Sequence, residues 1–137
     1  MHRALCSAHF PVAVFYGEVG VRGSLNPKLS MSLSTAGFNR FLSDGGGVDF
    51  RLNEDCWLSL CVGDVFEFVE DPSQERRYSV RILALYKEPS FGELIDSLPD
   101  ALFEKSEKQA YLEFFSKWWS AEDQEREGTL ALHIEVL

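Results

Sequence analysis

The segment RRYSVRILALY, residues 76–86, is the longest β-type run in the sequence and needs a partner strand. Its β-branched and aromatic residues favour extended structure. The segment DVFEFVE, residues 64–70, precedes it, and the loop between the two contains Pro72 and Ser73. This order predicts an antiparallel hairpin, so we expect a fold built on an antiparallel sheet.

Three further segments alternate apolar and polar residues, the pattern of a strand that buries one face. They are KLSMSLS (28–34), VDFRL (48–52) and TLALHIEVL (129–137). We expect the last of them to complete the sheet. Residues 1–27 are interpreted as an N-terminal extension, in which PVAVFYGEV is a candidate for an added edge strand.

Apolar residues three and four positions apart predict three helices, over residues 35–43, 91–98 and 107–127. The first ends at a run of glycines. The second begins with a capping box, because Glu93 follows Ser90 by three residues. Strands and helices in this order predict an α+β fold.

The length of 137 residues, of which 45% are hydrophobic, suffices for one core and is too short for two ordinary domains. The predicted core combines the apolar faces of the strands and helices. Its residues are Phe38, Phe41, Phe66, Phe68, Ile82, Phe91, Leu94, Trp118, Leu130 and Leu132.

The net charge of −9 argues against a surface that coats nucleic acid, because such surfaces gather lysine and arginine. A local basic pocket remains compatible with this charge, since one short segment contains Arg76, Arg77, Arg81 and Lys87. The alternative is an ordinary solvated hairpin.

No apolar run approaches the roughly 20 residues that span a bilayer, and the first residues lack the order of a secretory signal. We therefore expect a cytoplasmic protein without a membrane partner. The cysteines and histidines show no metal-ligand spacing, so no metal or cofactor is predicted. Cys56 and Cys61 flank an apolar stretch and are expected to be buried thiols.

Four segments in their order along the chain resemble the ASCH domain, a small β-barrel related to the PUA fold. They are FNRFLSDGGGVDFRLNE (38–54), VGDVFEF (62–68), ILALYKEPSFGELIDSLP (82–99) and WWSAEDQEREGTLALHIEVL (118–137). The resemblance covers residues 28–137. It implies a mostly antiparallel barrel of five or six strands with flanking helices, and a cleft that takes RNA or a nucleoside.

Asp49 and Arg51 stand at the acidic and arginine positions of the resembling family's glycine-turn strand. Because they are two apart on a strand, both point to one face. Arg51 offers a fork of donors to a phosphate or base edge, and Asp49 can accept from an exocyclic amine. We expect a cleft between the strands GGGVDFR (45–51) and RILALYKE (81–88), with Arg51 as the anchoring cation and Asp49, Lys87 and Arg81 beside it. The alternative is a surface ion pair or an arginine that staples the core.

In the branch of the resembling family that hydrolyses N4-acetylcytidine, a lysine of the glycine turn is catalytic, helped by a threonine and a later glutamate. Here the lysine position is Gly46 and the threonine position is Asp49, while Glu104 or Glu107 would supply the glutamate. A glycine cannot transfer a proton. The resemblance therefore favours a degenerate turn and a binding protein over an enzyme, and leaves open whether any catalysis remains.

Three hypotheses about function follow. The first is a non-catalytic PUA-like domain that binds RNA, a nucleotide or a modified nucleoside in the barrel cleft. The second is an amidohydrolase that acts on N4-acetylcytidine-like nucleosides. The glycine at position 46, where the resembling hydrolases have lysine, argues against it. The third is an acidic protein-interaction domain, motivated by the net charge and by Trp118 and Trp119, of which only one can face the core. The oligomeric state is left open.

Overall fold

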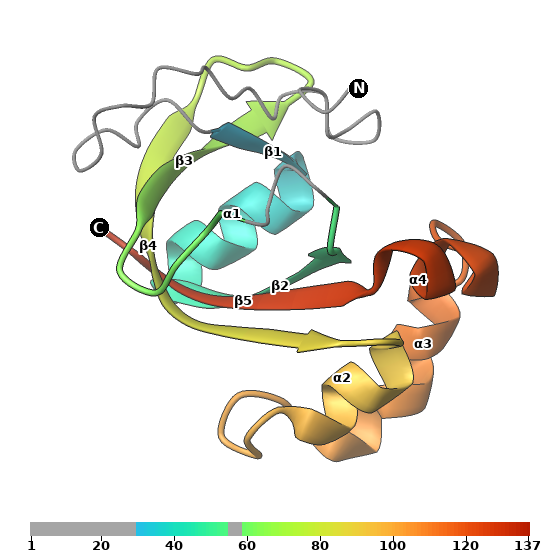
Figure 1. Cartoon of the computed structure of the whole chain (residues 1–137). Coiled ribbons are helices and arrows are strands. Elements are labelled where there is room, and N and C mark those ends of the chain that lie inside the picture. Colours follow the sequence, from blue (N-terminus) through green and yellow to red (C-terminus); the bar gives the residue numbers. More distant parts are fainter. Residues whose placement is uncertain (1–29, 55–58) are drawn as a thin grey trace.

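A curled sheet of five strands forms a half-barrel at the centre of the protein (Figure 1). The computed structural model describes residues 30–54 and 59–137, and these form an α+β fold. The candidate edge strand before residue 28 lies outside the described residues, as does Cys56. Cys61 is exposed, so the expectation of a buried thiol is wrong at that position.

The strands follow the spatial order β1-β3-β4-β5-β2. Their bounds are Ser30–Ser34 (β1), Gly46–Leu52 (β2), Val65–Asp71 (β3), Arg77–Glu88 (β4) and Thr129–Val136 (β5). β1 pairs in parallel with β3, and the other three pairings are antiparallel. The mostly antiparallel sheet and the β3–β4 hairpin are thus confirmed.

The helices include two that match the predicted segments closely. Their bounds are Thr35–Asp44 (α1), Phe91–Ser97 (α2), Lys108–Phe115 (α3, preceded by the 3₁₀ turn Lys105–Glu107, η4) and Ala121–Glu127 (α4). The side chains of Ser34 and Ser90 cap α1 and α2 by accepting a backbone N–H.

The single helix predicted over residues 107–127 is wrong, because the chain breaks it between α3 and α4. Ser120 begins α4 with a complete capping box: its hydroxyl accepts the Asp123 N–H, and the Asp123 carboxylate accepts the Ser120 N–H. These reciprocal bonds stabilise a new helix start inside a continuous helical pattern.

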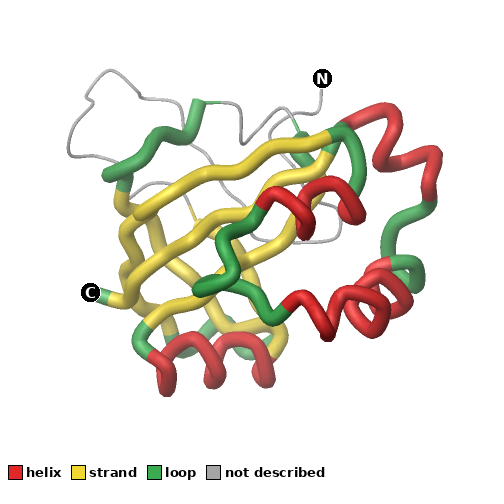
Figure 2. Tube along the Cα trace, turned by 90° about the horizontal axis from the view of Figure 1, so that it is seen from below, coloured by secondary structure: helices red, strands yellow, loops and turns green. Residues whose placement is uncertain are grey.

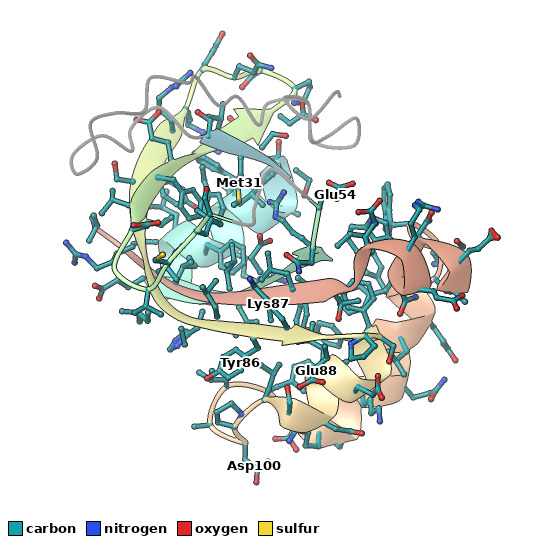
Figure 3. All side chains as sticks on the ribbon, in the orientation of Figure 1. Met31, Glu54, Tyr86, Lys87, Glu88 and Asp100 are labelled. Atoms are coloured by element: carbon teal, nitrogen blue, oxygen red, sulfur yellow. The ribbon has the colours of Figure 1, made fainter. Side chains whose placement is uncertain are left out.

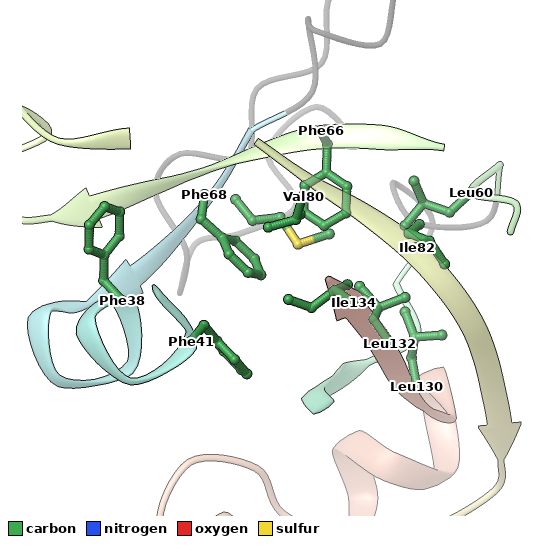
Figure 4. Close-up of a cluster of buried hydrophobic side chains, with 11 residues drawn as sticks. Phe38, Phe41, Leu60, Phe66, Phe68, Val80, Ile82, Leu130, Leu132 and Ile134 are labelled. Carbon is green, nitrogen blue, oxygen red and sulfur yellow. The ribbon is translucent and has the colours of Figure 1, made fainter. Parts of the chain in front are cut away.

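The concave face of the half-barrel holds the main core, and α1 packs into it (Figure 4). This barrel core consists of Met31, Phe38, Phe41, Leu60, Phe66, Phe68, Val80, Ile82, Leu130, Leu132 and Ile134. Alternate residues of β5 point the other way, and Ala131 joins a second cluster.

The second cluster covers the outer face, where α2, α3 and α4 gather on one side of the sheet, apart from α1 (Figures 1 and 2). Its buried members are Leu52, Phe91, Leu94, Ile95, Leu98, Phe103, Phe115, Trp119 and Ala131. Phe50 of β2 connects the layers, because its ring lies 5.1 Å from that of Phe115.

Every residue of the predicted core is buried except Trp118, for which the prediction is wrong. Trp118 is 61% exposed, while the neighbouring Trp119 is only 9% exposed. Trp119 takes the inward position because the break before α4 turns its ring onto Phe91, at 5.3 Å between ring centroids.

Candidate functional site

Three residues on three neighbouring strands form a row across the concave face. Arg51 of β2 stands directly opposite Leu130 of β5, and Lys87 of β4 stands opposite Leu130 from the other side. Because Leu130 belongs to the barrel core, Arg51 and Lys87 share its face. The two strands that were expected to border a ligand cleft are therefore separated by β5.

Arg51 is buried inside the half-barrel, with 1% of its surface exposed. Its Nε donates to the carboxylate of Asp49, and its Nη2 lies 3.5 Å from the carbonyl oxygen of Ser32 in β1. β1 and β2 are the two ends of the strand order. The guanidinium thus bridges the two edges of the curled sheet, and this placement matches the interpretation of a core-stapling arginine rather than that of an exposed anchoring cation.

Arg81 lies on the opposite face from Lys87. It stands opposite Glu135, one position away from the inward pair Ile82 and Ile134, and its Nη1 is 3.1 Å from a Glu135 carboxylate oxygen. The cause is a register shift between Ile82 and Ala84, which reverses the alternation along β4. Simple alternation would have put Arg81 and Lys87 on one face.

The expected basic segment does not gather into a positive groove. Arg76 pairs with Glu70 at 3.0 Å and Arg77 pairs with Glu67 at 3.0 Å. Hydrogen bonds from Arg76 lower the pKa of Glu70 to about 2, so this carboxylate stays ionised at any ordinary pH. Of the four cations, Lys87 is the exposed one for which the described residues provide no carboxylate partner.

Asn53 extends the row of inward residues beyond the end of β2. Its N–H donates to the Gly128 carbonyl at 3.0 Å, so the β2–β5 ladder continues past Leu52. The alternation then places the Asn53 side chain on the same side as Arg51. Its Oδ1 is buried and accepts no hydrogen bond from the described residues. A buried acceptor without a donor costs free energy, and such groups are often completed by a ligand or water.

Glu54 follows Asn53 and is half-buried at the open end of the sheet (Figure 3). Burial, reinforced by the nearby charge of Glu127, raises the pKa of Glu54 to about 7, while Arg51 acts in the opposite direction. A carboxyl with this raised pKa still carries a proton in part of the molecules near neutral pH, and can then donate as well as accept.

Asn53, Glu54 and Lys87 together are called the mouth site. It presents a buried amide oxygen as acceptor and a cation on the concave face of the sheet, together with the neighbouring Glu54 carboxyl, which can donate. Strands two apart are separated by about 10 Å, and Asn53 is offset from Lys87 by two positions along β5, or about 7 Å. The two backbones are thus about 12 Å apart, a span that the long lysine side chain and one small ligand can bridge together. Asn53 and Glu54 were not among the predicted binding residues, because the sequence around them does not indicate that polar side chains are buried there.

The glycine run is a packing element. Gly45 ends α1 in the left-handed conformation at φ 80°. A Cβ on Gly46 would lie 2.3 Å from the Ile134 carbonyl oxygen, and one on Gly47 would lie 2.7 Å from the ring of Phe41. The backbone at Gly46 therefore leaves no room for the lysine that the resembling hydrolases carry there.

The described residues contain no group of three or more His, Cys, Asp or Glu side chains arranged to hold a metal ion. None of the helices in the described ranges is both long enough and apolar enough to span a membrane.

Two solved structures resemble this fold. The crystal structure of the hypothetical protein PH0355 superimposes with a TM-score of 0.63 at 13% identity, covering 79% of this chain and 97% of that chain. The solution NMR structure of protein PF0455 from Pyrococcus furiosus gives a TM-score of 0.58 at 18% identity, covering 79% of this chain and 96% of that chain. No protein-family model matches the sequence, and no curated protein matches it either. At these identities the two likenesses concern the fold alone.

Proposed function

We propose that this protein is a non-catalytic binding domain of PUA or ASCH type that holds a nucleoside or nucleotide at the mouth site. The observation that carries the proposal is the buried Asn53 Oδ1, an acceptor to which no described residue donates, beside the half-buried Glu54. An amide oxygen and a carboxyl that can donate are complementary to the mixed donor and acceptor edge of a nucleobase. Lys87 adds a cation for a phosphate or a ribose hydroxyl.

The charge distribution favours a small ligand over a long RNA strand. Binding along a phosphate backbone requires several cations that are free to replace counterions. Here Arg76, Arg77 and Arg81 each pair with a carboxylate, and the chain carries a net charge of −9. Of the four cations of this segment, only Lys87 lacks a carboxylate partner among the described residues, which is enough for a single phosphate and too little for a backbone track.

Hydrolysis of an acylated nucleoside is the weaker candidate. The position that corresponds to the catalytic lysine is Gly46, which packs directly against the β5 backbone. Loss of a general base costs a factor of about 100 to 10,000 in rate. Glu54, with its raised pKa, and the Lys87 amine are titratable groups of the mouth site, but neither stands at the position of the resembling family's catalytic lysine.

Titration calorimetry against nucleosides, nucleoside monophosphates and N4-acetylcytidine tests the proposal at pH 7 and at two salt concentrations. We expect saturable binding that Asn53→Leu weakens by about 10-fold or more, because it removes the acceptor and keeps the volume. Lys87→Ala should weaken a monophosphate more than its nucleoside. Lys117→Ala is the matched control, since Lys117 is an exposed lysine in the turn that follows α3, outside the mouth site.

Two outcomes would overturn the proposal. One is the absence of saturable binding to every probe at both salt concentrations. The other is binding that Asn53→Leu and Lys87→Ala leave unchanged, which would place the ligand elsewhere. Release of cytidine from N4-acetylcytidine in proportion to enzyme would instead support the hydrolase.

A further inference from the structure

Phe114 and Trp118 form an exposed aromatic pair at the end of α3. Phe114 is 52% exposed and Trp118 is 61% exposed. They are four residues apart on a continuing helical turn, so they lie on one face, with 6.3 Å between their ring centroids. Neighbouring exposed aromatic rings of this size are unusual on a surface without a partner.

The pair is held by the folded core. The Phe114 ring lies 6.1 Å from the buried ring of Phe115, and Phe115 in turn lies 6.0 Å from the buried Trp119. The N–H groups of Trp118 and Trp119 both donate to the Phe115 carbonyl at 2.9 Å. The exposed rings therefore stand on an ordered base, so these two side chains lose less conformational entropy when a partner docks.

The segment that carries the pair, residues 104–127, contains more acidic than basic residues. Glu107, Glu113, Glu122 and Glu125 are exposed, and within the described ranges no cation pairs with them. The cations of the same region are largely neutralised. They pair as Lys105 with Asp100, Lys108 with Asp96, and Arg126 with Asp123 and Glu127.

Lys117, beside Trp118, is the exception, because the described residues include no carboxylate partner for it. The unpaired carboxylates still outnumber it. A surface of this sign repels the phosphates of RNA and attracts a cationic peptide segment.

We propose that Phe114 and Trp118 form a docking surface for a basic segment of another protein. An apolar or aromatic side chain of that segment covers the two rings. Its arginine or lysine side chains lie over the Trp118 face and toward Glu113 and Glu122, where cation–π and charge attraction add to apolar burial. This surface lies on α3, whereas the mouth site lies at the ends of β2 and β4, so the two proposals stand or fall separately.

Selection from a library of random 12-residue peptides displayed on phage tests the proposal. We expect the wild-type protein to enrich peptides that combine arginine or lysine with an aromatic or aliphatic residue. A synthetic copy of an enriched peptide should bind at least 10-fold more weakly to Trp118→Ala and to Phe114→Ala. The matched control is Leu83→Ala, because Leu83 is also an exposed apolar residue but lies on β4.

A second variant keeps the aromatic rings and reverses the charge. Glu113→Lys combined with Glu122→Lys should weaken the same peptide at low salt by about 5-fold or more, and the effect should shrink as salt rises. Circular dichroism melting shows whether each variant is folded. All of the changed side chains are exposed, so we expect wild-type melting curves.

Four results would overturn the proposal. Peptide enrichment that is absent, or that is equal for wild type and Trp118→Ala, removes the docking surface. Enrichment of acidic peptides contradicts the charge argument. Sedimentation equilibrium that shows a dimer abolished by Trp118→Ala assigns the surface to a second copy of the chain. Saturable binding of single-stranded RNA that Trp118→Ala abolishes assigns it to stacked bases.

Discussion

Removing the charge of Arg51 should destabilise the fold strongly, because it leaves the buried Asp49 carboxylate without its cation. The perturbation is Arg51→Met, which keeps much of the apolar stem and deletes the guanidinium. Arg51 is 1% exposed, and its partner Asp49 is also buried. Breaking a buried ion pair by removing one partner costs about 3–5 kcal/mol. The bridge from β2 to the Ser32 carbonyl of β1 is lost at the same time.

This cost is a large fraction of the roughly 5–15 kcal/mol by which domains of this kind are stable. Urea unfolding at pH 7, followed by circular dichroism, measures it directly. The double variant Asp49→Leu with Arg51→Met removes both charges, and we expect it to recover most of the loss, because apolar replacements of buried pairs are often neutral or stabilising.

Arg81→Met is the matched control. Its ion pair with Glu135 is partly exposed on both sides, so the expected loss is about 0–1 kcal/mol. A loss below about 1 kcal/mol for Arg51→Met, or a double variant no more stable than the single one, would refute the reasoning that Arg51 staples the barrel through Asp49.

Three further predictions concern stability. Because the pKa of Glu54 is raised to about 7 in the folded protein, its protonated form favours folding, and this contribution falls as pH rises from about 4.5 through 7. Glu54→Gln should therefore gain stability relative to wild type between pH 5 and pH 8 in urea unfolding; a constant difference would contradict the shift. Gly46→Ala should cost roughly 1–3 kcal/mol or more through the clash with the Ile134 carbonyl, and Gly63→Ala, which meets nothing within 4 Å, should cost less. Phe66→Ala and Leu132→Ala should each cost roughly 2–5 kcal/mol, and a loss below about 1 kcal/mol at both would show that the barrel core is misplaced.

The sequence alone was sufficient to predict the local elements. The alternation in residues 129–137 marks β5, and the spacing of apolar residues after Ser34 and Ser90 marks α1 and α2. These signals are reliable because they are local. Apolar residues that recur every two residues mark the buried face of a strand, and those that recur about every 3.6 residues mark the buried face of a helix, whichever element packs against it. The cap residues act on backbone groups within three positions, so they too are legible in the chain.

Tertiary structure decided where the local rules met a competing interaction. The capping box of Ser120 and Asp123 breaks the long predicted helix. As a result Trp119 is buried, and Trp118, which was predicted to be buried, is exposed. The register shift between Ile82 and Ala84 reverses the faces of β4, which sends Arg81 and Lys87 to opposite sides. Neither event leaves a trace in hydrophobic periodicity.

The candidate site depended on tertiary structure most of all. That Asp49 and Arg51 share a face follows from their spacing of two, but their burial requires the curl that brings β1 toward β2. Asn53 and Glu54 stand out only in the folded structure, which leaves the Asn53 Oδ1 without a donor among the described residues and raises the pKa of Glu54. Desolvation and charge proximity are properties of the space around a group, and residues distant in the chain define that space.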